Sequence, residues 1–430
     1  MKRIQKNKIS SKKYFWSCSN FLLFSLALLT ASIVHTEESN AATPDMAIPD
    51  IAIPDISIPE PSKFTFNGSG FLTAGAGKML GGTRQSVLDL RCPCFTADYA
   101  QNAIYDDRSG IQFGPDSKLG LQGTVNFPSP DWSVTAQAVS RGSEGGEVNL
   151  EWLYGTYWLN DSTSIQFGRK RLPILFYSDS QDVGFALPWT HLPPQQYGWE
   201  VVNYNGINIQ HVDQLGSWDV RANMLAGHER VRDSGYWKVY RGQQSRTRVR
   251  WENIFGGNVT LAKDWFEARL SYIQAKTTRN NINEWDSGTQ TLIPSTDPLL
   301  AEDGSRQKIY VAAFNVDYEN WLLLTEFLHI DRQAATFNDF ASRVGLIRRM
   351  GEWEAGINWS EYYGKAVVGA GGNPQGQESH SNRSLTVRHY LSPHSDIKIQ
   401  LDYQRERGGV DWTPKYGHAR LLTLAYDRIF

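Results

Sequence analysis

Long apolar runs and cysteines are both scarce in this sequence, and each scarcity excludes a class of protein. No stretch reaches the ~18 consecutive apolar residues that a membrane-spanning helix needs, which argues against a helical membrane protein. The chain has only three cysteines, and Cys18 lies in a segment that we expect to be removed. Cys92 and Cys94 cannot supply the four ligands of a structural zinc site. We expect them to be bonded to each other or to nothing.

Neither sign of charge dominates the chain. Its 43 Lys and Arg and its 45 Asp and Glu give a formal net charge of −2. Removal of residues 1–41 takes away six basic and two acidic residues and leaves 37 against 43, a net charge of −6. Because a nucleic-acid-binding surface needs an excess of basic groups, we expect no nucleic-acid partner.

The first 62 residues differ in composition from the rest. Six basic residues precede the apolar run Phe21–Val34, and a small-x-small end, Ser39–Ala41, follows it. This order is typical of a secretory signal peptide, predicted here as residues 1–41. An uncleaved anchor is the alternative, which the shortness of the run disfavours. Residues 42–62 contain an Ile-Pro-Asp repeat whose prolines prevent a regular helix. We expect an extended periplasmic spacer, or a docking strip for an envelope partner.

From Lys63 to the C-terminus the sequence alternates between apolar and polar residues. In the segment Ile397–Gln404 the odd positions are apolar and the even positions are polar, and the same pattern starts at Trp132, Trp218 and Trp353. A period of two is typical of a strand with one apolar and one polar face. The chain is therefore predicted to be all-β.

The lengths of the connections separate a membrane barrel from a soluble sandwich. Short turns alternate strictly with long polar loops along the chain. The short turns fall at 128–131, 160–162, 213–217, 263–264, 319–320, 351–352 and 392–395. The long loops fall at 77–109, 141–147, 170–197, 227–245, 278–306, 332–340, 363–381 and 406–417. Because outer-membrane barrels combine short periplasmic turns with long extracellular loops, residues 63–430 are predicted to form a transmembrane antiparallel β-barrel of about 16 strands.

Tryptophans support this prediction, since indole rings favour the membrane interface. Five short turns deliver a Trp to the start of the next strand: Trp132, Trp218, Trp265, Trp321 and Trp353. Two strands depart from the alternation. Trp321–Leu324 is apolar on both faces and Lys308–Val316 is ambiguous, and we expect these strands to lie at a subunit contact.

The C-terminal strand ends on Phe430, which resembles the closing strand and assembly signal of outer-membrane barrels, although Arg428 replaces a usual apolar residue. The segment Gly168–Pro173 and the residues around Asp182 and Trp189 resemble Gram-negative porins near the phosphate-selective and DcaP-like families. The resemblance covers residues 63–430. It implies an outer-membrane homotrimer with one water-filled pore per subunit, contact with lipid and lipopolysaccharide, and insertion by the barrel-assembly machinery. The proline repeat departs from the helical N-terminal extension of DcaP-like proteins.

The resemblance also implies that the third extracellular loop, 170–197, folds into the barrel and narrows the pore. Its prolines and aromatic residues would stiffen it. The expected constriction consists of the charged residues of this loop: Lys170, Arg171, Asp179, Asp182 and His191. The alternative is that these charges are solvated at the mouth of the barrel.

A row of three arginines, Arg246, Arg248 and Arg250, occupies one face of a strand. Because a basic residue facing lipid near the midplane costs about 2–4 kcal/mol, the row is predicted to line the lumen and to favour anions. Strand parity adds further basic residues to the lumen: Arg221, Arg269, Arg388 and Lys398. It also adds acidic ones: Glu151, Glu252, Glu267, Glu354 and Asp402. This mixed lining fits a transverse electric field across the lumen as well as it fits anion selectivity. A further alternative is that the two sets of residues form ion pairs with each other.

The sequence contains no catalytic Ser/His or Asp/His constellation, no metal-ligand spacing and no phosphate loop before a helix. We therefore expect no enzymatic activity, no catalytic residue, no metal and no cofactor. The predicted function is a passive outer-membrane pore for small hydrophilic solutes, leaning towards anions such as carboxylates or phosphate. The alternative is a structural or adhesive barrel with a closed lumen and an N-terminal arm that tethers the envelope.

Overall fold

The computed structural model describes residues 63–107, 110–129, 131–286, 288–295, 304–333, 337–366, 378–407 and 416–430. The expected signal peptide, 1–41, and the proline-rich segment, 42–62, lie outside the described residues. Among the described residues, no helix combines the length and apolarity needed to cross a membrane.

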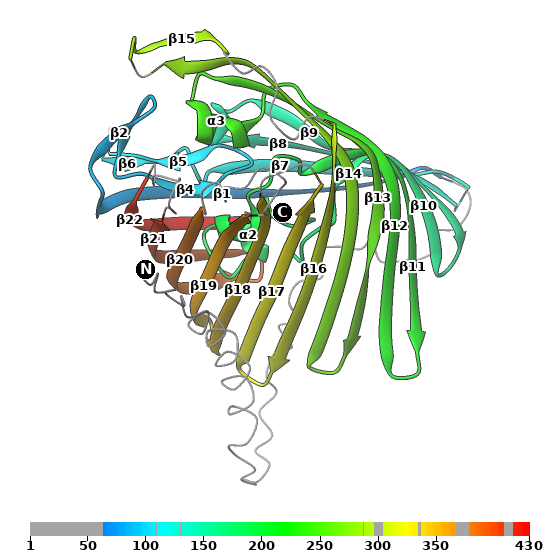
Figure 1. The fold of residues 1–430 in the computed structure, drawn as a ribbon. Coiled ribbons are helices and arrows are strands. Elements are labelled where there is room, and N and C mark those ends of the chain that lie inside the picture. Colours follow the sequence, from blue (N-terminus) through cyan, green and yellow to red (C-terminus); the bar gives the residue numbers. More distant parts are fainter. Residues whose placement is uncertain are drawn as a thin grey trace, which may run out of the picture. The chain divides into compact units, whose positions relative to one another are not determined.

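Sixteen long strands form one antiparallel sheet that closes on itself (Figure 1). In chain order they are β1 (Thr65–Gly82), β7 (Lys118–Asn126), β8 (Trp132–Arg141), β9 (Val148–Asn160), β10 (Thr163–Arg171), β11 (Asn203–Leu215), β12 (Trp218–Val231), β13 (Arg246–Lys263), β14 (Phe266–Asp286), β16 (Ser305–Tyr318), β17 (Trp321–Arg332), β18 (Phe337–Met350), β19 (Trp353–Ala366), β20 (Ser379–Ser392), β21 (Ser395–Arg407) and β22 (His418–Ile429). Strand β1 pairs with β22 on one side and with β7 on the other, and Gly70 and Phe430 exchange two backbone hydrogen bonds at the seam. The predicted all-β barrel is confirmed.

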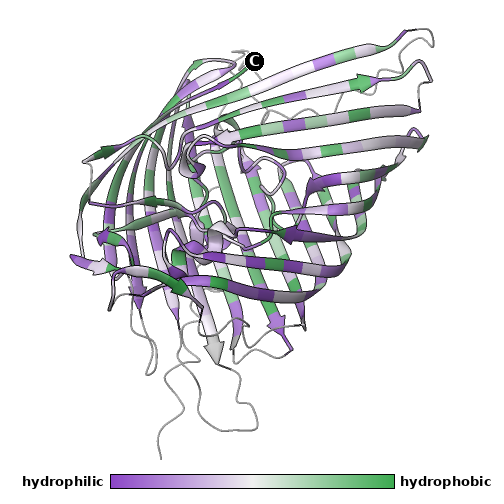
Figure 2. Cartoon of the chain, turned by 90° about the horizontal axis from the view of Figure 1, so that it is seen from above, coloured by the Kyte–Doolittle hydropathy of each residue, from purple (hydrophilic) through white to green (hydrophobic). Residues whose placement is uncertain are grey.

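The two faces of each strand follow the predicted alternation. On β21 and β22, Ile399, Leu401, Leu422 and Leu424 are exposed on the outer face, whereas Lys398 is fully buried on the inner face. Figure 2 shows the same alternation as green and purple bands along the strands. Four of the five turn tryptophans are exposed at the periplasmic end: Trp132, Trp265, Trp321 and Trp353. An apolar outer surface with an aromatic rim matches a bilayer environment.

Most of the inner face of β17 is apolar for a reason that the sequence did not indicate. Leu322, Leu324, Leu328 and Ile330 on β17 are buried against residues of the loop 172–202, which lies inside the barrel. The strand Trp321–Leu324 is therefore apolar on both faces because one face meets lipid and the other meets this loop. A subunit contact is not needed to explain it.

The connection from β1 to β7 carries five short strands: β2 (Gln85–Val87), β3 (Leu90–Cys92), β4 (Phe95–Asp98), β5 (Ala103–Tyr105) and β6 (Ile111–Gln112). Cys92 and Cys94 form a disulfide there. The same buried cluster contains Val239 of helix α3 (Gly235–Arg241) and Tyr416 from the connection before β22. Strand β15 (Thr291–Pro294) pairs antiparallel with the end of β14, and the two project beyond the barrel (Figure 1). Three extracellular connections thus pack together near the mouth.

Candidate functional site

Residues 172–202 connect β10 to β11, and we call this segment the crossing loop. It contains a short 3-10 turn, Gly184–Ala186, and the one-turn helix α2 (Pro194–Tyr197), and most of its side chains are buried. Its side chains and carbonyl groups contact β8, β13, β17, β19, β21 and β22. Helix α2 lies within the ring of strands in Figure 1. The loop therefore runs across the interior of the barrel.

The first anchor of the crossing loop is Asp182. Arg141 on β8 donates two hydrogen bonds to its carboxylate, at 2.9 and 2.7 Å, and Arg171 at the end of β10 forms an ion pair with it. Glu151 on β9 pairs with the same two guanidinium groups, at 2.7 and 3.5 Å. Burial disfavours the charged form of Asp182, but the two arginines outweigh burial and hold the pKa of Asp182 well below its usual range. The anchor is therefore charged at neutral pH.

The second anchor joins the loop to β20, β21 and β22. Lys398 donates to the carbonyl oxygen of Gly184 at 2.6 Å and to Asp427 at 2.9 Å. Arg388 donates to the carbonyl oxygen of Phe185 at 2.5 Å. Both cations face inward, as the alternation of residues along their strands predicted. Because they are buried and bound to the loop backbone, they are shielded from any solute in the lumen.

His191 holds the loop between two carboxylates. Its Nδ1 lies 3.2 Å from Asp116 and its Nε2 lies 3.5 Å from Asp402 on β21. Burial lowers the pKa of an imidazole, but Asp116 and Asp402 outweigh burial, so the pKa of His191 is raised above its usual range. Lys118 opposes this effect, and Tyr105 shares Asp116 by donating to it at 2.7 Å.

We expect the stabilisation from His191 to be lost as pH rises. A group whose pKa is raised by folding stabilises the fold fully below its unfolded pKa of about 6.5, and this contribution disappears as pH passes the higher folded value. His191→Gln should lower the urea midpoint of unfolding in acid and leave it nearly unchanged at alkaline pH. A difference between the two proteins that grows with pH would contradict the assignment.

The third anchor is Arg343 on β18, which is fully buried. Its guanidinium lies over three rings of the crossing loop, at 5.3 Å from Tyr177, 4.9 Å from Trp189 and 5.6 Å from Tyr197. Glu326 on β17 lies 3.4 Å from the guanidinium and accepts hydrogen bonds from the Tyr197 hydroxyl and from a backbone N–H of the loop, both at 2.7 Å. This pair holds the middle of the loop against the wall.

The fourth anchor is Glu200, near the end of the loop. Arg279 on β14 donates to both of its oxygens, at 2.8 and 2.7 Å, and the indoles of Trp237 and Trp251 donate at 2.9 and 3.0 Å. Burial disfavours the charged form, but Arg279 outweighs it, and the pKa of Glu200 is lowered. The loop is therefore fixed at both of its ends and in its middle.

One side of the crossing loop meets water. Asp179 is exposed, in a loop whose other charged residues are buried. Lys170 on β10 is half-buried, its ammonium lies 4.8 Å from the centre of the Tyr154 ring, and the charge of Asp179 acts on it. A cation on the wall thus faces an anion on the loop.

The wall opposite this side is polar. Arg221 on β12 is exposed and in register with Thr260, which is in register with Arg269, and Arg269 donates to the loop carbonyl of Pro173 at 2.9 Å. Residues opposite each other in a sheet share a face, so Arg221 points inward. A ladder of side-chain amides crosses β10–β13 beside it: Gln166, Asn208, Asn223 and Asn258.

The barrel is similar to solved outer-membrane proteins at low sequence identity. OmpT of Vibrio cholerae has a TM-score of 0.52 at 8% identity, over 87% of this chain and 100% of that one. The outer membrane channel DcaP of Acinetobacter baumannii has a TM-score of 0.50 at 9% identity, over 85% and 97%. Pseudomonas putida OprB has a TM-score of 0.51 at 10% identity, over 85% and 94%. This is the fold of a Gram-negative outer-membrane porin. No family model and no curated protein matches the sequence.

Within this porin fold, the predicted site residues on the inner side divide into three groups. Three expected constriction residues are buried in the anchors of the crossing loop: Arg171, Asp182 and His191. Inward-facing residues that are bound to the loop or to each other are Arg269, Arg388, Lys398, Glu151, Glu354 and Asp402. Residues with water access on the inner side are Lys170, Asp179, Arg221 and the half-buried Glu267. Among these inward charges, Arg388 and Glu354 form the kind of ion pair between the two sets that was given above as the alternative, whereas the others bind the crossing loop or residues outside the two sets.

The prediction that Arg246, Arg248 and Arg250 line the lumen of the barrel is wrong. All three are exposed, while Thr247, Val249 and Trp251 between them are buried, and the indole of Trp251 reaches Glu200 inside. The arginines therefore point outward. Glu252, predicted as a lumen acid, lies 3.8 Å from Arg250 on the same outer side.

Two features of β13 explain this error. The register shifts between Glu252 and Phe255, and such a bulge exchanges the two faces of the strand. The strand also has 18 residues, whereas about 10 cross a bilayer, so the arginines at its extracellular end lie beyond the hydrocarbon. The cost of facing lipid does not apply to them.

Sequence reasoning missed the residues that hold the crossing loop most firmly: Arg141, Glu200, Arg279, Glu326 and Arg343. One signal was present. Glu326 shares its strand parity with Leu322, Leu324 and Leu328, so a charge falls within an apolar face. Such a charge needs a buried partner.

Proposed function

We propose that the protein is a passive outer-membrane channel for small hydrophilic solutes. The observation that carries this proposal is the two-sided character of the crossing loop. The loop is tied to β8 and β10 through Asp182 and packs against β13–β18, whereas Asp179 stays exposed on the side of Lys170 on β10. Solutes then pass between the loop segment 176–180 and the wall that carries Lys170, with no chemical step.

We propose only a slight preference for anions, because the arginine row that predicted a stronger one points outward. Lys170 on the wall faces Asp179 on the loop, which makes a transverse field across the path, and Arg221 adds an inward cation on β12. The inner charges with water access are two cations, Lys170 and Arg221, and two anions, Asp179 and the half-buried Glu267, so the proposed preference for small anions is slight. Carboxylates and phosphate remain the proposed solutes.

A closed, structural or adhesive barrel is the second candidate. Several inward side chains of β21 and β22 are buried completely, and the connections around Cys92, Val239 and Tyr416 pack over the mouth. Insertion of the purified protein into a planar lipid bilayer separates the candidates. Stepwise current increments support the channel, and a silent membrane with correctly folded protein supports the closed barrel.

We also propose an outer-membrane homotrimer, delivered by the signal peptide and inserted by the barrel-assembly machinery through Phe430. The trimer form of Vibrio cholerae OmpT, which has a similar fold, supports this assembly. We propose lipopolysaccharide as the partner of the outward arginines at the extracellular rim. Arg250 lies in register with the exposed Arg230, and such guanidinium groups suit the phosphates of lipopolysaccharide.

Replacing Arg246, Arg248 and Arg250 with Ala should weaken lipopolysaccharide binding. Charge-assisted hydrogen bonds contribute about 1.5–3 kcal/mol each, so the loss should exceed roughly tenfold in affinity. Titration of the detergent-solubilised protein with purified lipopolysaccharide measures this. Arg221→Ala, which removes an inward arginine, is the matched control, and equal losses in both variants would contradict the outward assignment.

A further inference from the structure

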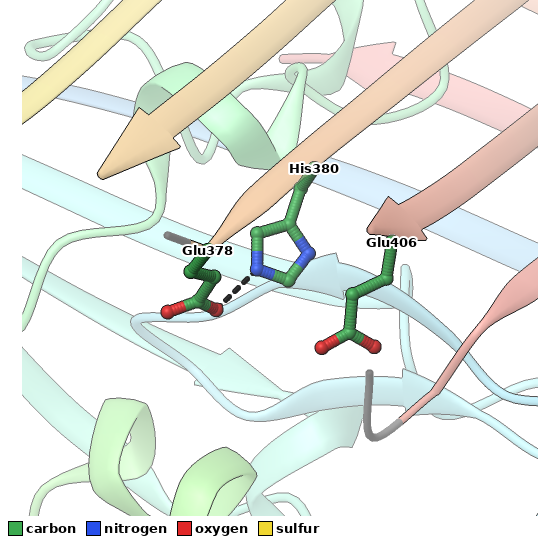
Figure 3. A group of neighbouring side chains, drawn as sticks. All are labelled: Glu378, His380 and Glu406. Carbon is green, nitrogen blue, oxygen red and sulfur yellow. Dashed lines mark hydrogen bonds and ion pairs between the residues drawn. The ribbon is translucent and has the colours of Figure 1, made fainter. Parts of the chain in front are cut away.

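A group of three ionisable side chains lies at the extracellular ends of β20 and β21, away from the crossing loop. One ligand atom from each of Glu378, His380 and Glu406 lies within 4.8 Å of the other two (Figure 3). Glu378 directly precedes β20, His380 is on β20, and Glu406 is opposite His380 in the register with β21. The sequence hides this group because the two glutamates are far apart along the chain.

Both nitrogens of His380 are turned into this group. Nε2 is hydrogen-bonded to Glu378, and Nδ1 points to the side of Glu406 (Figure 3). The ring is 95% buried, and Nδ1 has no hydrogen-bond partner. The hydroxyl group of Tyr99, whose ring centre lies 6.2 Å from that of His380, is also buried without a partner. Two polar groups are therefore left unsatisfied beside the two carboxylates.

The charge in this pocket is not balanced by protein groups. Among the residues that the structure describes, neither Glu378 nor Glu406 forms an ion pair with a lysine or arginine. One imidazole, even when protonated, leaves an excess of one negative charge. Tyrosine rings surround the group: Tyr99, Tyr236, Tyr240 and Tyr362. Because an uncompensated buried charge is costly, such a pocket favours a cation.

We propose that Glu378, His380 and Glu406 bind a divalent transition-metal ion of the Zn2+ class. One imidazole nitrogen with two carboxylate oxygens is a donor set that Zn2+ accepts, with water in the remaining position. The imidazole selects against Mg2+ and Ca2+, which prefer oxygen ligands. Glu406 also accepts the backbone N–H groups of Tyr416 and Gly417. A bound ion thus links β20 to the connection before β22, at the mouth of the barrel.

The test uses the full chain in detergent, stripped of metal with a chelator and titrated with Zn2+ by calorimetry. We expect one ion per chain. His380→Gln and Glu406→Gln should each weaken binding by at least the ~10-fold typical of losing even an outer-sphere partner. His418→Gln, which removes an exposed histidine at the same end of the adjacent strand β22, is the control and should bind as the wild type does.

A second measurement needs no variant. Co2+ bound to the wild-type protein should show visible absorption bands that Zn2+ removes and that a tenfold excess of Mg2+ or Ca2+ leaves in place. Absence of these bands, equal Zn2+ binding by the wild type and His380→Gln, or displacement by Mg2+ or Ca2+ would each overturn the proposal.

Discussion

Arg343→Ala is expected to release the middle of the crossing loop and to destabilise the barrel by about 3 kcal/mol or more, because it leaves Glu326 buried without its cation. The variant also removes the guanidinium group that lies over Tyr177, Trp189 and Tyr197. Cation–π contacts of desolvated groups contribute about 2 kcal/mol each in favourable cases. Chymotrypsin should then cleave the loop at aromatic residues that are protected in the wild type.

Two further variants make this result specific. Arg348→Ala removes an exposed arginine of the same strand, whose guanidinium lies 5.1 Å from the Trp321 ring on the outer surface, and it should leave the loop protected. Arg343→Lys keeps the charge but loses the planar group, so it should give intermediate cleavage. Full protection of the loop in Arg343→Ala would show that this anchor is dispensable.

Arg221→Ala should lower the anion-to-cation permeability ratio about fourfold. A unit charge ~10 Å from a permeating ion in water contributes about 0.4 kcal/mol, favourable for an anion and unfavourable for a cation, so the ratio changes by about 0.8 kcal/mol, which is roughly a factor of four. Asp179→Asn should change the ratio in the opposite direction by a similar factor. The reversal potential of the purified channel in a salt gradient measures both changes.

The triple variant Arg246→Ala, Arg248→Ala, Arg250→Ala is the control for this experiment. The three side chains point outward, so the reversal potential should not change. A large shift in the triple variant with none in Arg221→Ala would mean that the lumen lies on the other side of β13.

The barrel could be predicted because its determinants are local. Strand alternation depends only on neighbouring residues, and the seven short turns fall between consecutive strands where the sequence placed them. The outward arginines could not be predicted in the same way. The face of each residue is assigned by counting alternate positions along a strand. One bulge between Glu252 and Phe255 exchanges the two faces, and no residue type in the sequence indicates this bulge.

The partners that anchor the crossing loop could not be predicted from neighbouring residues, for a different reason. Resemblance to porins predicted that the loop folds inward, and Asp182 and His191 were among its expected residues. Their partners are brought together only by closure of the sheet: Arg141 is on β8 and Asp402 is on β21. The unusual two-sided apolar character of β17 was visible, and it reflects the loop packed on the inner wall rather than a neighbouring subunit.

Thiol modification of Asp179→Cys during single-channel recording tests the central claim most directly, because the proposed path of the solutes runs past residue 179. Cys92 and Cys94 are bonded to each other, so the new thiol is the reactive group among the described residues. We predict that a charged methanethiosulfonate reagent reduces the current in steps, and that Asp213→Cys, exposed near the periplasmic end of β11, conducts unchanged after the same treatment. An open channel whose current ignores modification at 179 would contradict the proposed path.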